Sequence, residues 1–561
     1  MSKHYWVAAV AAMFSSLVYG QNLEQIGSQP PVSLTGGLSA TASFYGATGI
    51  QNRRAPFSYI LTGSPTLNFY NSISIPFFFT YSEQERVFRQ PYNQFGFSPY
   101  YKWITLYAGY RNLNYSEFTL GGHTFLGGGF DLHPGIFHFG FIYGRFNRAT
   151  PVDTTSASFQ PYTYANWGYA ARIGVGKGAN FLDFSFLRAR DDSSSVHPDS
   201  AFAGKVNPAQ NFVLGMKGQV KFLDHFIFSL EAATSLYNSN LFNHSVLSDS
   251  AKSVYTRFLG KMIATNSSTQ DYNALLSALT YQDKTFAVRL QYRRVDPGYK
   301  SMGAYFFNND VENITLAPSF HLFHNKFRFG GSIGYQHDNL NKQKVTTSSR
   351  LIGSANLSAE FNQHFGVDMS YTNYANTQRH QVILVKDTFR LAQVSQNFSF
   401  TPHYIHASQD RIHAVIFSAN YNLFSSVDKS INSQMDTKSY NLFLNYQLTL
   451  VPDNLTLTSN LNYMDVKASN IEEGNYGITL GASKGFLKNK LTAGWNGSFL
   501  KGISANSKGL ILNQSISINY RISKHHSFGF NASYINNRSQ VTILNPVYSE
   551  WRGDLGYRFI F

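Results

Sequence analysis

The fold is decided by the segment Trp551-Arg552-Gly553-Asp554-Leu555-Gly556-Tyr557-Arg558-Phe559-Ile560-Phe561. Five large apolar side chains share one parity, and the charged side chains Arg552, Asp554 and Arg558 take the other. The five are Trp551, Leu555, Tyr557, Phe559 and Phe561. Successive side chains of a β-strand point to opposite faces of the sheet. The segment therefore predicts a strand with one apolar, aromatic face and one charged face.

This segment resembles the closing strand of bacterial outer-membrane β-barrel proteins. Members of that class end on an aromatic residue and carry apolar residues at every second position before it. Here the resemblance rests on Tyr557, Phe559 and Phe561. It implies an integral β-barrel of a Gram-negative outer membrane, with these three residues as the assembly signal that the barrel-assembly machinery reads.

The start of the sequence fits export from the cytoplasm. Lys3 gives a positive region, residues 6–14 are apolar, and Val18-Tyr19-Gly20 offers small residues for cleavage before Gln21. This predicts a signal peptide over residues 1–20. A Gln directly after the cleavage site resembles exported proteins of Bacteroidota. The absence of cysteine excludes a lipoprotein and a disulfide scaffold.

Composition favours a barrel over other exported folds. Aromatic residues make up 16% of the chain, yet the mean hydropathy is −0.23. A membrane barrel combines the two because its aromatic side chains face lipid while its interior stays polar. After residue 20, no apolar run approaches the length of a spanning helix. The alternative, an array of soluble β-sandwiches, would need linkers between modules of about 100 residues, and the sequence offers none.

Apolar and polar residues alternate along most of the chain. In 514–522, Ile516, Ile518 and Tyr520 oppose Ser515 and Ser517, and 286–293, 442–450 and 454–463 follow the same rule. The pattern predicts an all-β fold: a transmembrane antiparallel up-and-down β-barrel of about 26 strands, within a range of roughly 22 to 28. The barrel would occupy 32–561, after a short periplasmic segment over 21–31.

The predicted strands are separated alternately by short turns and longer polar loops. Short turns are expected around residues 71, 224, 283, 325, 363, 452, 488 and 524. Short periplasmic turns, long extracellular loops and two periplasmic termini are typical of the outer membrane. The expected strands are 32–45, 57–70, 72–82, 103–111, 113–121, 124–132, 135–147, 161–174, 179–189, 209–222, 225–238, 270–282, 284–295, 311–323, 326–339, 348–362, 364–375, 387–401, 409–422, 434–449, 454–467, 471–483, 488–500, 507–521, 524–536 and 548–561.

Several basic residues fall on the luminal parity of these strands. They are Arg289, Arg293, Arg521, Arg552 and Arg558. With a formal net charge of +15, a basic, polar lumen would favour anions or polyanions. Positive charge could equally bind lipopolysaccharide phosphates at the outer rim or balance luminal acids.

A barrel of this size needs something to fill its lumen, because barrels of 16–18 strands already enclose an aqueous channel. Two outer segments, 83–102 and 239–269, are candidates. The second has helical spacing, and Val254, Tyr255, Phe258 and Leu259 could form a constriction helix in the mouth. An outer loop packed on its neighbours is the equal alternative.

The sequence narrows the function without fixing it. The segment 21–31 is too short for the plug of a TonB-dependent transporter, so an unplugged, self-plugged or partner-plugged lumen is expected. No catalytic constellation, cofactor motif or converging metal ligands are apparent, so an enzyme is not expected, and an exported chain is not expected to bind nucleic acid. We expect a porin-like channel for polar or anionic solutes or an exported polymer. The alternative is a non-conducting barrel, plugged by a partner protein, in a secretion or envelope-assembly complex.

Overall fold

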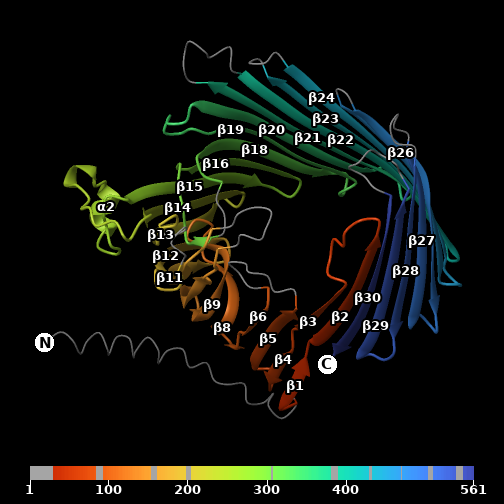
Figure 1. Cartoon of the computed structure of the whole chain (residues 1–561), viewed down its shortest axis with the longest axis horizontal. Helices are drawn as coiled ribbons and strands as arrows, with labels where there is room; N and C mark the ends of the chain where they lie inside the picture. Colours follow the sequence, from red (N-terminus) through yellow and green to blue (C-terminus); the bar gives the residue numbers. More distant parts are fainter. Residues whose placement is uncertain are drawn as a thin grey trace.

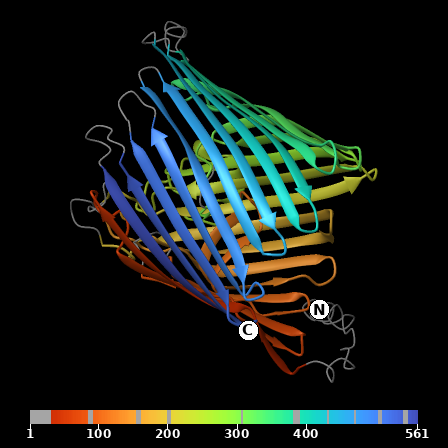
Figure 2. The same cartoon turned by 90° about the vertical axis from the view of Figure 1, so that its right-hand side faces the viewer.

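The β-strands close into one ring (Figure 1), in a computed structural model that describes residues 30–83, 92–152, 161–197, 204–304, 308–380, 390–428, 433–468, 471–502, 509–538 and 547–561. The ring is an antiparallel barrel of 26 strands, as the sequence predicts. Figure 2 shows the strands running obliquely from one end of the barrel to the other, as closure of a sheet requires. The predicted signal peptide lies outside the described residues.

Three of the barrel strands are each interrupted into two segments. These are β1 (Val32–Thr35) with β2 (Gly37–Thr48), β3 (Phe57–Gly63) with β4 (Thr66–Phe69), and β6 (Gln94–Phe97) with β7 (Tyr100–Tyr101). The remaining barrel strands are continuous. They are β5 (Ile73–Ser82), β8 (Ile104–Asn114), β9 (Leu120–Leu132), β10 (Phe137–Asn147), β11 (Ala165–Lys177), β12 (Asn180–Asp192), β13 (Gln210–Phe222), β14 (Phe226–Asn238), β15 (Thr269–Gln282), β16 (Phe286–Val295), β18 (Val311–Leu322), β19 (Phe327–His337), β20 (Thr346–Glu360), β21 (Phe365–His380), β22 (Arg390–Ala407), β23 (Arg411–Asp428), β24 (Ser433–Leu450), β25 (Leu455–Ala468), β26 (Ile471–Phe486), β27 (Leu491–Gly502), β28 (Leu510–Arg521), β29 (His526–Asn537) and β30 (Tyr548–Ile560).

Among the described residues, two short helices and one short strand stand apart from the wall. The helices are η2 (Asp249–Ala251) and α2 (Val254–Leu259), both between β14 and β15. The strand, β17 (Gly303–Ala304), lies between β16 and β18 and pairs in parallel with β9. No helix in the described ranges is long and apolar enough to span a membrane.

The first and last strands of the chain close the ring. β2 pairs antiparallel with β30 along its whole length, from Gly37 opposite Ile560 to Thr48 opposite Ser549. Every other wall strand pairs with its sequence neighbours. All backbone groups along the seam therefore find partners, which a spanning sheet requires in a medium without water.

The eight short turns predicted from sequence all lie between paired strands, at one end of the barrel. In the turn after β4, Tyr70 and Asn71 have φ of 48° and 49°. Positive φ at consecutive residues matches the twist of the flanking strands in short hairpins. The sequence Gly176-Lys177-Gly178 likewise ends β11 and starts a tight turn into β12.

The strand assignment from sequence was wrong between residues 83 and 121. Residues 94–101 were expected in an outer loop, but β6 and β7 pair with β5 and β8 as part of the wall. Residues 113–121 were expected as a strand, but 115–119 form a bend between β8 and β9. One missed strand and one extra strand leave the predicted number of strands unchanged. The glycine-rich run in β9 weakened the alternation that the prediction needed.

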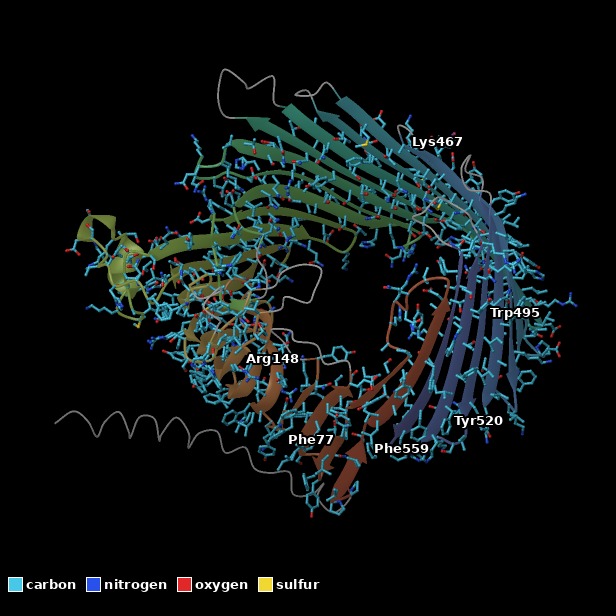
Figure 3. The ribbon with its side chains drawn as sticks, in the orientation of Figure 1. Phe77, Arg148, Lys467, Trp495, Tyr520 and Phe559 are labelled. Carbon is cyan, nitrogen blue, oxygen red and sulfur yellow. The ribbon has the colours of Figure 1, made fainter. Side chains whose placement is uncertain are left out.

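Apolar side chains cover the outer surface of the ring. In Figure 3, Trp495, Tyr520 and Phe559 lie on the outside of the wall, and Phe559 and Trp551 share a parity on β30. Most of the exposed large hydrophobic residues belong to this outward parity. The described chain thus carries its apolar surface outward, as the alternation predicts.

Candidate functional site in the barrel lumen

The luminal wall is covered on one side by an inner layer, defined here as residues 115–119 and 296–304. Strand β10 shows the effect. Its outward residues Phe139 and Phe141 are 36% and 37% exposed, whereas Ile142 and Phe146, which point inward, are 0% exposed. In a barrel whose wall is a single layer, inward side chains would be in contact with water. Here they belong to a dry cluster shared with the inner layer.

The two parts of the inner layer are joined to each other. Tyr299 Oη donates a hydrogen bond to the Phe118 carbonyl at 2.8 Å, and Ser301 Oγ donates to the Thr119 carbonyl at 2.5 Å. Gly303 then pairs with Leu120 in the parallel bridge between β17 and β9. Burial raises the pKa of Tyr299, so its phenol stays a neutral donor.

Glu231 on β14 fastens the 115–119 segment to the wall. Its carboxylate accepts hydrogen bonds from Ser116 Oγ at 2.8 Å and from the Glu117 amide. Its other oxygen lies 3.7 Å from Lys217 Nζ. Only 7% of Glu231 is exposed, and a buried carboxylate needs such partners to remain in place.

Buried amide and hydroxyl groups fasten the 296–304 segment. Asn211 accepts from the Met302 amide at 3.0 Å and donates to Ser235 Oγ at 2.8 Å. Ser235 Oγ donates in turn to the Lys300 carbonyl at 2.6 Å. These hydrogen bonds hold the segment against β13 and β14 rather than leaving it free in the lumen.

Two groups of polar contacts lie on the inward face of the neighbouring strands. Arg172 Nη2 is 3.1 Å from Asp131 Oδ1, and Tyr107 Oη donates to Asp131 Oδ2 at 2.9 Å. His138 Nδ1 is 2.8 Å from Asp183 Oδ1. The first group of contacts joins β8, β9 and β11, and the second joins β10 to β12, so each of the two acids has a partner on another strand.

On the opposite side of the lumen, from β19 to β28, small uncharged polar side chains line the middle of the strands, and Arg328, Arg350 and Asp368 share the same inward parity nearer the strand ends. Two rows of inward residues, set by the strand register, illustrate this surface. The first row is Ser332, Ser354, Thr372, Asn397, Asn422 and Ser439, and the second is Asn445, Asn460, Thr479, Ser498 and Asn513.

Some hydrogen-bonding capacity of the polar side chains on this side is unused. Ser332 bonds to Ser354 at 2.8 Å and Thr479 to Ser498 at 2.7 Å. The Oδ1 atoms of Asn462 and Asn513, by contrast, have no partner among the described residues. These two atoms are buried, whereas Thr372 and Asn397 of the first row are exposed and can offer hydrogen bonds to water or to a solute.

The five arginines singled out from sequence all lie on the inward parity of their strands. The structure does not bring them together into one site. Arg293 forms an ion pair with Glu117 at 2.6 Å, and Arg552 forms one with Asp554 at 2.9 Å. Arg289 donates to Gln291 Oε1 at 3.1 Å. Arg521 and Arg558 form no ion pair within the described part of the chain.

The candidate constriction helix lies outside the ring. Ser253 caps α2 by accepting from the Thr256 amide at 3.0 Å. Leu259 is buried against Phe212 and Leu236 on the outer face of β13 and β14, and Figure 1 shows α2 beyond the wall. The other three residues of the expected constriction, Val254, Tyr255 and Phe258, are 78%, 46% and 77% exposed. The spacing predicts the helix, but it does not say on which face of the sheet the helix packs.

The segments that enter the lumen, 115–119 and 296–304, were not foreseen. One signal was available in β10, where Phe139, Phe141, Ile142, Tyr143 and Phe146 place apolar residues on both parities. A strand with both faces buried reads as a nearly continuous apolar run. Such a strand in a barrel wall indicates that something covers it from inside.

The tyrosine and phenylalanines of the expected assembly signal lie at the seam. Phe559 packs against His526 and Phe561, with ring centroids 4.9 and 5.0 Å apart. Tyr557 packs against Phe528 at 4.8 Å. In the described ranges, no group of three or more His, Asp or Glu side chains is placed to hold a metal ion.

No protein-family model matches this sequence, and no curated protein matches it either. Solved structures share the large barrel only loosely. The FrpB iron transporter from Neisseria meningitidis (F5-1 variant) has a TM-score of 0.39 and 12% identity, over 96% of this chain and 84% of that one. The P pilus usher (PapC) translocation pore has a TM-score of 0.37 and 9% identity, over 94% and 99%. OccAB2 of Acinetobacter baumannii has a TM-score of 0.30 and 9% identity, over 69% and 100%. Similarities at this level carry no argument about function.

Proposed function

We propose that this protein is an outer-membrane channel through which polar solutes cross along the two neutral rows of β19 to β28. The observation that carries the proposal is the asymmetry of the lumen. One side is sealed by the inner layer, and the other side presents amide and hydroxyl groups to water. A polar wall facing a narrowed lumen is how barrel channels select what passes.

The outer membrane is the environment that this surface suits. A closed antiparallel ring pairs its backbone groups internally, as hydrocarbon requires, and its apolar exterior can face lipid. By analogy with barrels of that membrane, the short turns and the two chain ends face the periplasm and the longer loops face outward. The net positive charge favours contact with lipopolysaccharide phosphates.

Uncharged solutes that form hydrogen bonds match the two polar rows best. Carboxamides and hydroxyls can replace part of the hydration of a carbohydrate or a peptide. They impose little electrostatic barrier on either sign of ion. We therefore propose weak ion selectivity along the centre of the lumen, in contrast to the anion preference expected from the sequence charge alone.

Single-channel recording in a planar bilayer tests the proposal. The purified barrel is compared with a variant in which residues 296–310 are replaced by Asn-Gly. That turn can connect β16 to β18 directly, because Val295 and Val311 are cross-strand partners. Wild type should conduct, and the variant should conduct more because half of the inner layer is gone.

Heat-modifiable migration on gels and sheet-rich circular dichroism show whether both proteins are folded. Folded wild type and folded variant that both fail to conduct would overturn the channel. Such a result, together with a stoichiometric partner that co-purifies in detergent, would support a barrel that serves as a scaffold for an assembly.

A further inference from the structure

Three cations lie in one row across β27, β28 and β30, at the end of the barrel that carries the short turns. The register places Arg521 of β28 opposite Ser527 of β29, and Ser527 opposite Arg558 of β30. Lys490 precedes β27, and its carbonyl accepts the Arg521 amide at 2.7 Å. We call Lys490, Arg521 and Arg558 the basic row.

The basic row faces the lumen. Tyr520 and Phe559, the strand neighbours of Arg521 and Arg558, lie on the outside of the wall in Figure 3, and alternation turns the two arginines inward. A hollow of about 420 Å³ lies over the row and is also lined by Ser39, Asn519 and Ser527. Cations and neutral donors therefore surround the same space.

The charges of the row are not compensated. None of its members forms an ion pair with an acidic group of the described residues, whereas Arg293 and Arg552 do. The nearest luminal acid on β30, Asp554, is already bonded to Arg552 and to Ser43 Oγ, the latter at 2.5 Å. All three side chains of the row are exposed to water, so they can meet a ligand.

The spacing of the row suits a phosphate group. Arg521 and Arg558 flank one intervening strand, so their backbones are about 10 Å apart. Both long side chains can reach the space above Ser527. Guanidinium groups bind phosphate through paired hydrogen bonds, and Ser527 and Ser39 add neutral donors.

We infer that the basic row is a binding site for a soluble phosphorylated anion that enters the lumen from the short-turn end. The inference deepens the proposed channel and rests on it only for the lumen being filled with water. It divides the luminal wall into an uncharged centre and one anion-attracting end. A phosphorylated solute would be held at this end before it passes the neutral rows.

Calorimetric titration of the detergent-purified barrel with pyrophosphate tests the site without requiring conduction. Wild type should bind pyrophosphate, and the variant K490Q/R521Q/R558Q should bind it at least about tenfold more weakly. The matched control is R411Q/K488Q/K524Q, which removes three cations from the same end of the barrel but outside the row. The control should bind like wild type.

Two results would overturn the site. One is the absence of pyrophosphate binding to folded wild type, and the other is equal weakening in the row variant and the control. Current recordings separate this failure from failure of the channel. A conducting barrel without pyrophosphate binding refutes the row alone, and a non-conducting barrel that binds pyrophosphate refutes the channel alone. In a conducting barrel, pyrophosphate should reduce the current of wild type and of the control, but not that of the row variant.

Discussion

Glu231 joins the 115–119 segment to the barrel wall. Its carboxylate satisfies one side-chain donor and one backbone donor of that segment and faces Lys217. A buried donor that loses its acceptor still carries the full desolvation penalty, because no hydrogen bond offsets it. A single carboxylate therefore connects the wall to the layer that narrows the lumen.

We predict that Glu231→Leu lowers the free energy of unfolding by about 2–5 kcal/mol, since it leaves two donors without an acceptor. Urea titration of the barrel in lipid vesicles measures the change. The matched control is Glu472→Gln, which perturbs an exposed ion pair with Lys467 at 2.7 Å and should cost less than about 1 kcal/mol. If the two substitutions lowered the free energy of unfolding equally, Glu231 would not hold the 115–119 segment in place.

Among the elements, the sequence predicts the strands best and the paths of the loops least. Strict alternation, as in β28, predicts a strand and assigns Arg521 to the lumen, because side-chain direction follows from parity alone. Alternation says nothing about a loop, whose path depends on partners far away in sequence. Tyr299 meets Phe118 only after the wall has formed. The helical spacing of 254–259 was likewise readable, but the outer face on which it packs was not.

The helix α2 yields a prediction at this scale. Leu259→Asp should release α2 from Phe212 and Leu236, because a carboxylate cannot remain buried against them. Limited proteolysis should then cut between β14 and β15 more readily. Single-channel conductance should not change, because α2 lies outside the ring. Increased conductance would instead place the helix in the permeation path, and Leu259→Met serves as the conservative control.

The whole molecule is held together at the seam between β2 and β30. Ser43 and Asp554 are cross-strand partners there, on the luminal side, and their side chains are bonded to each other. Closure at this seam makes the difference between a barrel and an open sheet with two edges. The sequence indicated closure through its last strand, but the register could come only from the paired strands.

Cysteine cross-linking tests the closure, since the chain has no cysteine of its own. The variant S43C/D554C should form a disulfide under mild oxidation and change its gel migration until it is reduced. The control S43C/R552C places the second thiol two residues along the same face, and it should cross-link far less. Similar cross-linking of both pairs would indicate that the register is not fixed.

The double thickness of one side has a mechanical consequence. From β9 to β16, the wall and the inner layer form a laminate, two layers packed on a buried hydrophobic cluster. Such close-packed interiors resist compression. The arc from β19 to β28 is a single sheet and bends more easily. Lateral pressure from the bilayer would therefore flatten the cross-section on that arc first, so the bore would change its width by movement of the amide-lined side while the laminated side stays still.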